Sequence, residues 1–252
     1  MAGHSKWNNI KRRKEAQDNK RAKMFTKYSK EIFAAVRNGG DDPSTNLRLR
    51  LALSKARAAN MPNDNIERTI KKAKGDQDGL TYEELTYEGY GPGGAAVMVQ
   101  ALTENKNRTV AEVRLAFNKN GGNMGEDGCV AFMFDHKGYL EMNRDDTTIS
   151  EDDMMLEAIE AGAEEFEYDE ERFIIYTDAA HFEDVKHELE QKGHVFSSAE
   201  VSMIPQTRTT LSDEDATNMM KLIDQLEDND DVQNVYHNFD ITEEQIQHLT
   251  IG

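Results

Sequence analysis

Residues 137–178 read KGYLEMNRDDTTISEDDMMLEAIEAGAEEFEYDEERFIIYTD, and they open the part of the chain whose order of elements decides the fold. Apolar residues alternate where strands are expected and recur every three or four residues where helices are expected. The predicted order is strand, helix, strand, strand, helix, strand, over 137–142, 150–162, 164–169, 172–178, 181–192 and 194–203. This βαββαβ order is typical of a ferredoxin-like domain.

The two predicted helices of this segment each carry three apolar residues that we expect to face the core. They are Met154, Leu156 and Ile159 on the first, and Phe182, Val185 and Leu189 on the second.

The elements on either side of this segment need one another to complete a domain. Before it we expect strands over 82–88, 95–103 and 130–134 with a helix around 110–117, and after it a helix over 212–227 and a strand over 232–239. The earlier group lacks a second helix and a closing strand, which the later group supplies. We therefore predict that residues 135–204 are inserted into an α+β domain made of 80–134 and 205–240, with strand 232–239 joining the sheet of the earlier strands.

Residues 1–75 are predicted to form a separate helical domain. A helix from about residue 11 to 36 is stopped by Asn38-Gly39-Gly40, and Ile66, Ile70 and Ala73 mark a third, short helix ending at Gly75. We expect Ser44 or Thr45 to cap the second helix, with Leu47, Leu51 and Ala58 facing inward. The predicted fold class is thus α+β with three domains: an N-terminal three-helix bundle, an α+β middle domain, and a ferredoxin-like domain inserted into the middle domain.

Charge is unevenly divided along the 252 residues, whose formal net charge is −18. Residues 1–74 hold 19 Lys and Arg against 7 Asp and Glu, a net charge of +12, whereas residues 75–252 hold 11 against 41, a net charge of −30. A basic region attracts polyanions by releasing their counterions, and an acidic remainder confines such a ligand to one end of the protein. The split predicts that affinity for nucleic acid resides in residues 1–75.

Eight bases lie between residues 6 and 23, interrupted only by Glu15 and Asp18. Lys and Arg contact phosphates, and Trp7 either stacks on an unpaired base or packs on the bundle. Arg108, in the polar segment 104–109, either binds phosphate or pairs with an acidic neighbour. The predicted nucleic-acid-binding residues are Lys6, Trp7, Lys11, Arg12, Arg13, Lys14, Lys20, Arg21, Lys23, Lys27, Lys30 and Arg108.

The patterns typical of enzymes and metal proteins do not occur. The glycine-rich segment 121–128 lacks the Lys-Ser/Thr of a P-loop, and the acidic runs 151–153 and 228–231 lack the spacing of a calcium loop. The histidines lack the spacing of a zinc site. We predict no catalytic residues, no metal, no cofactor and no small-molecule substrate.

The sequence shows no long apolar run and no apolar signal-peptide region. Cys129 is the single cysteine, so no internal disulfide is expected and a reducing compartment is indicated. We predict a cytoplasmic protein with no membrane partner.

The ferredoxin-like order also occurs in RNA-recognition modules, which read bases with aromatic residues on the first and third strands. Tyr139, Phe173 and Tyr176 lie on those strands. Residues 135–204 nevertheless hold 5 bases against 21 acids, so we do not expect this sheet to bind RNA directly.

Four motifs occur in one order: Gly3–Trp7 with the basic run behind it, Tyr87–Gly94, the segment Glu104–Thr109, and Gly121–Phe134. Together they make the chain resemble the YebC/PmpR family from residue 2 to about residue 240. The resemblance implies the three-domain organisation above. It also gives functional weight to Lys6, Trp7 and the bases of Lys11–Lys23, and to Asn107-Arg108-Thr109.

Bacterial members of that family are described as transcriptional regulators that bind DNA, and relatives are linked to translation and the ribosome. The resemblance therefore implies a regulator of gene expression without deciding between DNA and RNA. We find no recognisable reading helix of a helix-turn-helix and no dimerisation heptad, which weakens the case for a DNA operator. Because the bases spread along an arm and a helix face, which suits recognition of phosphates and shape, structured RNA, on the ribosome, is the favoured ligand. The alternative is an acidic scaffold that acts through protein partners.

Overall fold

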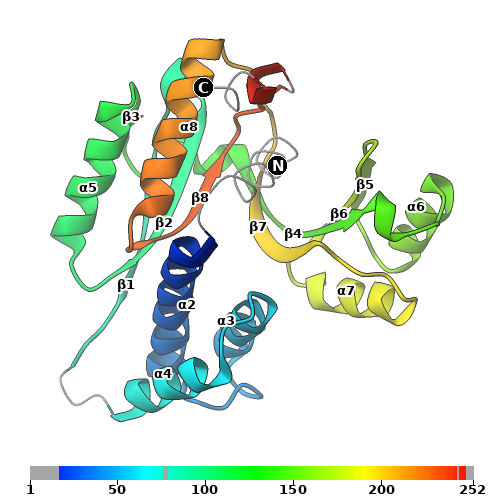
Figure 1. Cartoon of the computed structure of the whole chain (residues 1–252), viewed down its shortest axis with the longest axis horizontal. Helices are drawn as coiled ribbons and strands as arrows, with labels where there is room; N and C mark the ends of the chain where they lie inside the picture. Colours follow the sequence, from blue (N-terminus) through cyan, green and yellow to red (C-terminus); the bar gives the residue numbers. More distant parts are fainter. Residues whose placement is uncertain (1–16, 76–78, 243, 248–252) are drawn as a thin grey trace. The chain divides into compact units, whose positions relative to one another are not determined.

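The computed structural model describes residues 17–75, 79–242 and 244–247 (Figure 1), with the backbone alone for 17–20. The fold is α+β, with an N-terminal helical region and two antiparallel four-stranded sheets. The chain divides into two compact units, residues 133–206 and the remainder. The further division of the larger unit into a domain of 1–75 and a domain of 80–134 with 205–240 stays a prediction.

The N-terminal helices are α2 (Gln17–Gly39), α3 (Leu47–Ala58) and α4 (Asn63–Gly75). Their shared core includes Ile32, Phe33, Leu49, Leu53 and Ile66. Each helix turns an apolar stripe toward this core, as the spacing of these residues requires.

The predicted start and inner face of α3 were wrong. Asn46 caps the helix, because its side-chain oxygen accepts a hydrogen bond from the Leu49 amide at 3.0 Å. Leu47 is 55% exposed, and Ala58 is exposed as well. The buried face runs instead through positions i, i+3, i+4 and i+7: Leu49, Ala52, Leu53 and Ala56.

The first sheet has the order β3-β1-β2-β8, from strands Asn123–Met124, Glu83–Tyr90, Ala96–Thr103 and Val232–His237. Helices α5 (Lys106–Lys119) and α8 (Asp213–Asp228) lie on one face of it (Figure 1). Strand β8 pairs antiparallel with β2, so that Val97 lies opposite His237. This confirms the prediction that the last strand joins the sheet of the earlier ones.

The strand expected over 130–134 was wrong, and the two-residue strand β3 was missed. Residues Ala131–Met133 form a 3-10 turn, and Phe134 begins strand β4 of the other unit. The amides of Val130 and Ala131 donate to the Glu88 carboxylate rather than to a neighbouring strand, which explains why no ladder forms there.

The second unit contains the predicted βαββαβ order. Its elements are β4 (Phe134–Asn143), α6 (Glu151–Glu160), β5 (Glu165–Tyr168), β6 (Arg172–Asp178), α7 (Phe182–Gln191) and β7 (Ser198–Pro205). The strands are ordered β5-β6-β4-β7, and every pair is antiparallel.

The inner face of α7 is confirmed, whereas that of α6 was partly wrong. Met154 and Ala158 are buried on α6, but Leu156 and Ile159 are 56% and 58% exposed. The aromatic residues Tyr139, Phe173 and Tyr176 are all buried, so none presents a ring to a base in this structure.

Two further 3-10 turns span Pro92–Gly94 and Arg144–Asp146. Within the part of the chain that the structure describes, no helix is long and apolar enough to cross a membrane.

Candidate nucleic-acid interface

Half of the predicted binding residues lie outside the described residues. These are Lys6, Trp7, Lys11, Arg12, Arg13 and Lys14, while Lys20 lies in α2 with only its backbone described. The structure describes Arg21, Lys23, Lys27 and Lys30 on α2, and Arg108 on α5.

Three lysines of α2, spaced i, i+4 and i+7, contact the C-terminal end of α8 and the turn after it. Lys23 pairs with the Asp228 carboxylate at 3.0 Å, and the Lys27 ammonium donates to the Glu227 carbonyl at 2.6 Å. Lys30 donates to the Asp230 carbonyl at 2.8 Å. We call Lys23, Lys27 and Lys30 the docked face. Since the last carbonyls of a helix lack intrahelical partners and carry the negative end of its dipole, they are favourable acceptors for ammonium groups.

Lys27 is half-buried where it contacts α8. Burial lowers the pKa of Lys27, and the nearby carboxylates of Glu227, Asp230 and Asp228 partly offset that effect. A lysine in this position stabilises the contact between α2 and α8, and its ammonium is not presented to an outside ligand.

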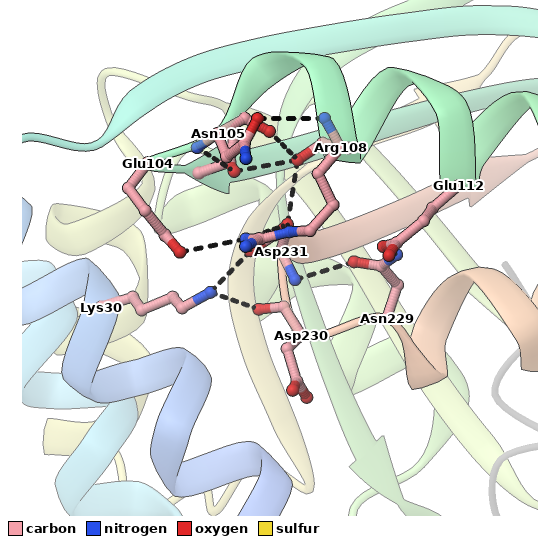
Figure 2. A network of polar contacts seen from close by, with 10 residues as sticks. Lys30, Glu104, Asn105, Arg108, Glu112, Asn229, Asp230 and Asp231 are labelled. Carbon is pink, nitrogen blue, oxygen red and sulfur yellow. Dashed lines mark hydrogen bonds and ion pairs between the residues drawn. The ribbon is translucent and has the colours of Figure 1, made fainter.

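Of the docked face, Lys30 also contacts Asp231, the residue that precedes β8 (Figure 2). Asp231 is about 2% exposed and accepts from Lys30 at 2.9 Å, from Thr109 Oγ1 at 2.9 Å, and from two nitrogens of Arg108 at 2.8 to 3.1 Å. Arg108 also pairs with Glu104 at 3.0 Å. We call these five residues the hub; it joins α2 to the first turn of α5 and to the turn between α8 and β8.

The charge of Asp231 is maintained by its partners. Burial alone would raise the pKa of this carboxyl, but hydrogen bonds from Lys30, Arg108 and Thr109 outweigh that effect and hold the pKa below its usual range. The hub therefore contains a buried carboxylate with two cationic partners rather than a protonated acid.

Two roles were considered for Arg108, and the structure shows the ion pair with acidic neighbours. The bidentate contact with Asp231 holds the planar guanidinium in one orientation. The hydrogen bonds that Arg108 donates to Asp231 and Glu104 raise the pKa of Arg108.

A second group of bases in the helical region has a different environment. Its members are exposed and, among the described residues, make no ion pair or side-chain hydrogen bond; we call them the open bases, Arg21, Arg50, Arg57, Lys71 and Lys72. Helix α3 has no acidic residue in its first turn, where Arg48 and Arg50 lie. Cations near a helix N-terminus oppose the helix dipole, so helix stability does not account for Arg50 there.

The amides of Gly122, Gly125 and Gly128 in the glycine-rich segment 121–128 are bonded within the protein. The Glu88 carboxylate is buried and accepts from the amides of Gly128, Val130 and Ala131 at 2.5 to 2.9 Å. Burial would raise the pKa of Glu88, but these three donors hold it below its usual range. The carboxylate of Glu88 in β1 thus holds the end of this segment against the strand.

The role of Asp231 was missed from the sequence. The acidic run 228–231, Asp-Asn-Asp-Asp, begins at the last residue of α8, whose last turn also contains Glu227. Acidic residues at a helix C-terminus oppose the dipole, and this unfavourable placement was the available signal that a basic partner lies nearby. Among the described residues, no group of three or more His, Cys, Asp or Glu side chains could hold a metal ion.

Comparison with known proteins matches both parts of the chain to one family. Residues 5–76 match the model of the TACO1/YebC protein N-terminal domain, and residues 82–239 match that of the TACO1/YebC second and third domain. The chain belongs to the TACO1/YebC family.

Relatives within the TACO1/YebC family are similar over nearly their whole length. A probable transcriptional regulatory protein of Geobacillus sp. (strain WCH70) is 62% identical, over 95% of this chain and 98% of the relative. The probable transcriptional regulatory protein YrbC of Bacillus subtilis (strain 168) is 55% identical, over 95% and 99%. The crystal structure of a conserved hypothetical protein from Aquifex aeolicus superposes with a TM-score of 0.79 at 45% identity, covering 90% of this chain and 93% of that one.

Proposed function

We propose that this protein is a non-enzymatic regulator of gene expression that binds nucleic acid through its basic N-terminal helices. The open bases carry the proposal: they are exposed cations that have no partner among the described residues, in the part of the chain where bases outnumber acids. Such groups contact phosphates without sequence preference. The names of the relatives support a regulatory role.

The contact residues we propose combine the open bases with the N-terminal bases Lys6, Lys11, Arg12, Arg13, Lys14 and Lys20, and with Trp7. The docked face and Arg108 receive a positioning role, because acceptors within the protein already occupy their charged groups. The predicted interface is therefore smaller and more selective than the basic composition alone indicates.

Structured RNA, on the ribosome, is the ligand we favour over a DNA operator. The open bases are distributed over three helices, which suits contacts to phosphates and to the shape of a folded RNA. Reading base edges in the major groove instead requires side chains concentrated on one inserted helix. Repulsion from residues 75–252, with 41 acids, favours a confined binding site over a long duplex.

The test is ultraviolet crosslinking in cells followed by sequencing of the attached nucleic acid. The wild type is compared with R50Q/R57Q and with K186Q/K221Q, a control that removes the same charge from exposed or half-exposed helix positions elsewhere. We expect ribosomal RNA to be enriched, with R50Q/R57Q reducing the yield and the control leaving it unchanged. Recovery of a discrete DNA site would overturn the choice of RNA. Absence of any crosslinked nucleic acid would favour the acidic scaffold.

A further inference from the structure

The net charge of helix α5 is opposite in sign to that of residues 75–252, which contain it. Residues 75–252 hold 11 bases, and four of them lie in the 14 residues of α5: Lys106, Arg108, Arg114 and Lys119. Glu112 is the one acid of the helix. A region with 41 acids therefore contains one helix of net positive charge.

One side of α5 packs on the sheet and leaves the opposite side exposed. Thr109, Val113, Ala116 and Phe117 are buried, at the spacing of a single helix face. On the opposite side lie Asn107, Arg114, Leu115, Asn118 and Lys119, all exposed, which we call the outer face of α5. Figure 1 shows this helix at the border of its unit, with the sheet and α8 on one side only.

The two cations of the outer face, Arg114 and Lys119, and the neighbouring Lys106 have no partners among the described residues. Arg108 is held by Asp231 and Glu104, and the Glu112 carboxylate accepts a hydrogen bond from Asn229 at 2.6 Å. No described group makes an ion pair or side-chain hydrogen bond with Lys106, Arg114 or Lys119. The charge of these three side chains is available to an outside anion.

Helix stability does not explain Arg114, which lies away from both ends of α5, whereas Lys119 in the last turn suits the helix dipole. The first turn of α5 contains no acid and carries Lys106, whose charge opposes the dipole. Leu115 lies between the cations at 60% exposure. Departures from local rules without a compensating gain in stability are expected at functional sites.

We propose that the outer face of α5 is a second contact surface for the nucleic acid bound by the N-terminal helices. The inference rests on the proposed function. Arg114 and Lys119 contact phosphates, the amides of Asn107 and Asn118 offer both donors and acceptors, and Leu115 contacts a ribose or a base. Charge complementarity selects a polyanion as the occupant, and the mixture of cations with amides suits RNA.

The hub links the N-terminal helices to α5, the two regions that we propose bind one nucleic acid. It fastens the first turn of α5 to α2 through Arg108, Asp231 and Lys30. Two linked surfaces bind one molecule more tightly than either alone when their geometry allows simultaneous contact. A folded RNA that contacts both surfaces gains affinity without any base-specific contact.

The test measures the salt dependence of binding by the full-length protein to a labelled single-stranded RNA. Three double variants are compared with the wild type: R114Q/K119Q on α5, R50Q/R57Q on α3, and the control K186Q/K221Q. The logarithm of the binding constant falls linearly with the logarithm of the salt concentration, and each phosphate contact to a single strand contributes about 0.7 to the steepness of that fall. We therefore expect a fall that is less steep by about 1.4 for each of the first two variants and an unchanged steepness for the control. Circular dichroism checks that each variant is folded.

The outcomes separate this inference from the proposed function. If R50Q/R57Q lowers the slope and R114Q/K119Q behaves like the control, the outer face is not a nucleic-acid contact, and the proposed function stands. If neither differs from the control, the proposed function fails together with this inference. If R114Q/K119Q weakens binding of a poly-glutamate peptide and not of the RNA, the face binds acidic proteins and the inference is overturned.

A photocrosslinking residue placed at position 115 gives a second readout that does not depend on charge. We expect it to attach to the RNA, whereas the same residue at exposed position 156 on α6 does not. Failure at position 115 with an RNA that the protein binds would overturn the proposal.

Discussion

The N-terminal helices carry two groups of bases that sequence composition does not distinguish. The docked face of α2 contacts the end of α8 and the hub, whereas the open bases of α2, α3 and α4 contact no acid within the described residues. Pairing with acceptors inside the protein, and not the number of bases, therefore distinguishes the surface that is available to a ligand. The docked face is expected to matter for stability, and the open bases for binding.

The largest effect is expected from Asp231→Ala, which removes the acceptor shared by Lys30, Arg108 and Thr109. Breaking a buried pair leaves uncompensated charge, so the free energy of unfolding should fall by about 3 kcal/mol. Chemical denaturation measures this. The control is Asp228→Ala, whose exposed pair with Lys23 should contribute less than about 1 kcal/mol. Equal losses for the two variants would show that the hub is no more important than a surface pair.

Acid should remove the contribution of the hub. Because the pKa of Asp231 is lowered on folding, its charge stabilises the protein above the unfolded pKa of about 3.9, and this contribution is lost as the pH falls through the lower folded pKa. The difference in unfolding free energy between wild type and Asp231→Asn should be full at pH 7 and shrink below about pH 4. Denaturation at pH 7, 4 and 3 measures it. A difference that stays constant with pH would contradict the assignment of a charged Asp231.

Charge substitutions in the first turns of α3 and α6 should affect protein stability and nucleic-acid binding differently. Arg50→Glu places an acid in the first turn of α3, which should raise stability by about 0.3–1 kcal/mol while weakening nucleic-acid binding. Asp152→Lys in the first turn of α6 should lower stability by a similar amount, about 0.3–1 kcal/mol, and leave binding unchanged. Thermal denaturation and a binding titration measure the two effects. The two substitutions change the net charge by equal amounts in opposite directions, so binding that weakens with Arg50→Glu and strengthens equally with Asp152→Lys would mean that overall charge, and not the open bases, controls affinity.

Much of the fold was accessible from the sequence because its signals are periodic. The βαββαβ order and the pairing of β8 with β2 followed from alternating and helical patterns. Short apolar patterns were less reliable. The apolar pattern of residues 130–134 predicts a strand, but Glu88, distant in sequence, accepts hydrogen bonds from the amides of Val130 and Ala131, and a turn forms there instead.

The site was less accessible, because the acids at the end of α8 indicate a basic partner but local sequence does not identify Lys30 as that partner. Lys23, Lys27 and Lys30 resemble binding residues until their acceptors on α8 are known. The same holds for α3, where apolar Leu47 proved exposed and the buried face began two residues later at Leu49.

The central claim is that the open bases bind nucleic acid, and the salt dependence of RNA binding by the full-length protein tests it most directly. The pairs R50Q/R57Q and K71Q/K72Q are each compared with K186Q/K221Q, which removes the same charge elsewhere. Each phosphate contact to a single strand contributes about 0.7 to the steepness with which the logarithm of the binding constant falls with the logarithm of the salt concentration. Loss of each open pair should therefore make this fall less steep by about 1.4, while the control leaves the steepness unchanged. Equal slopes for all three variants would contradict the account.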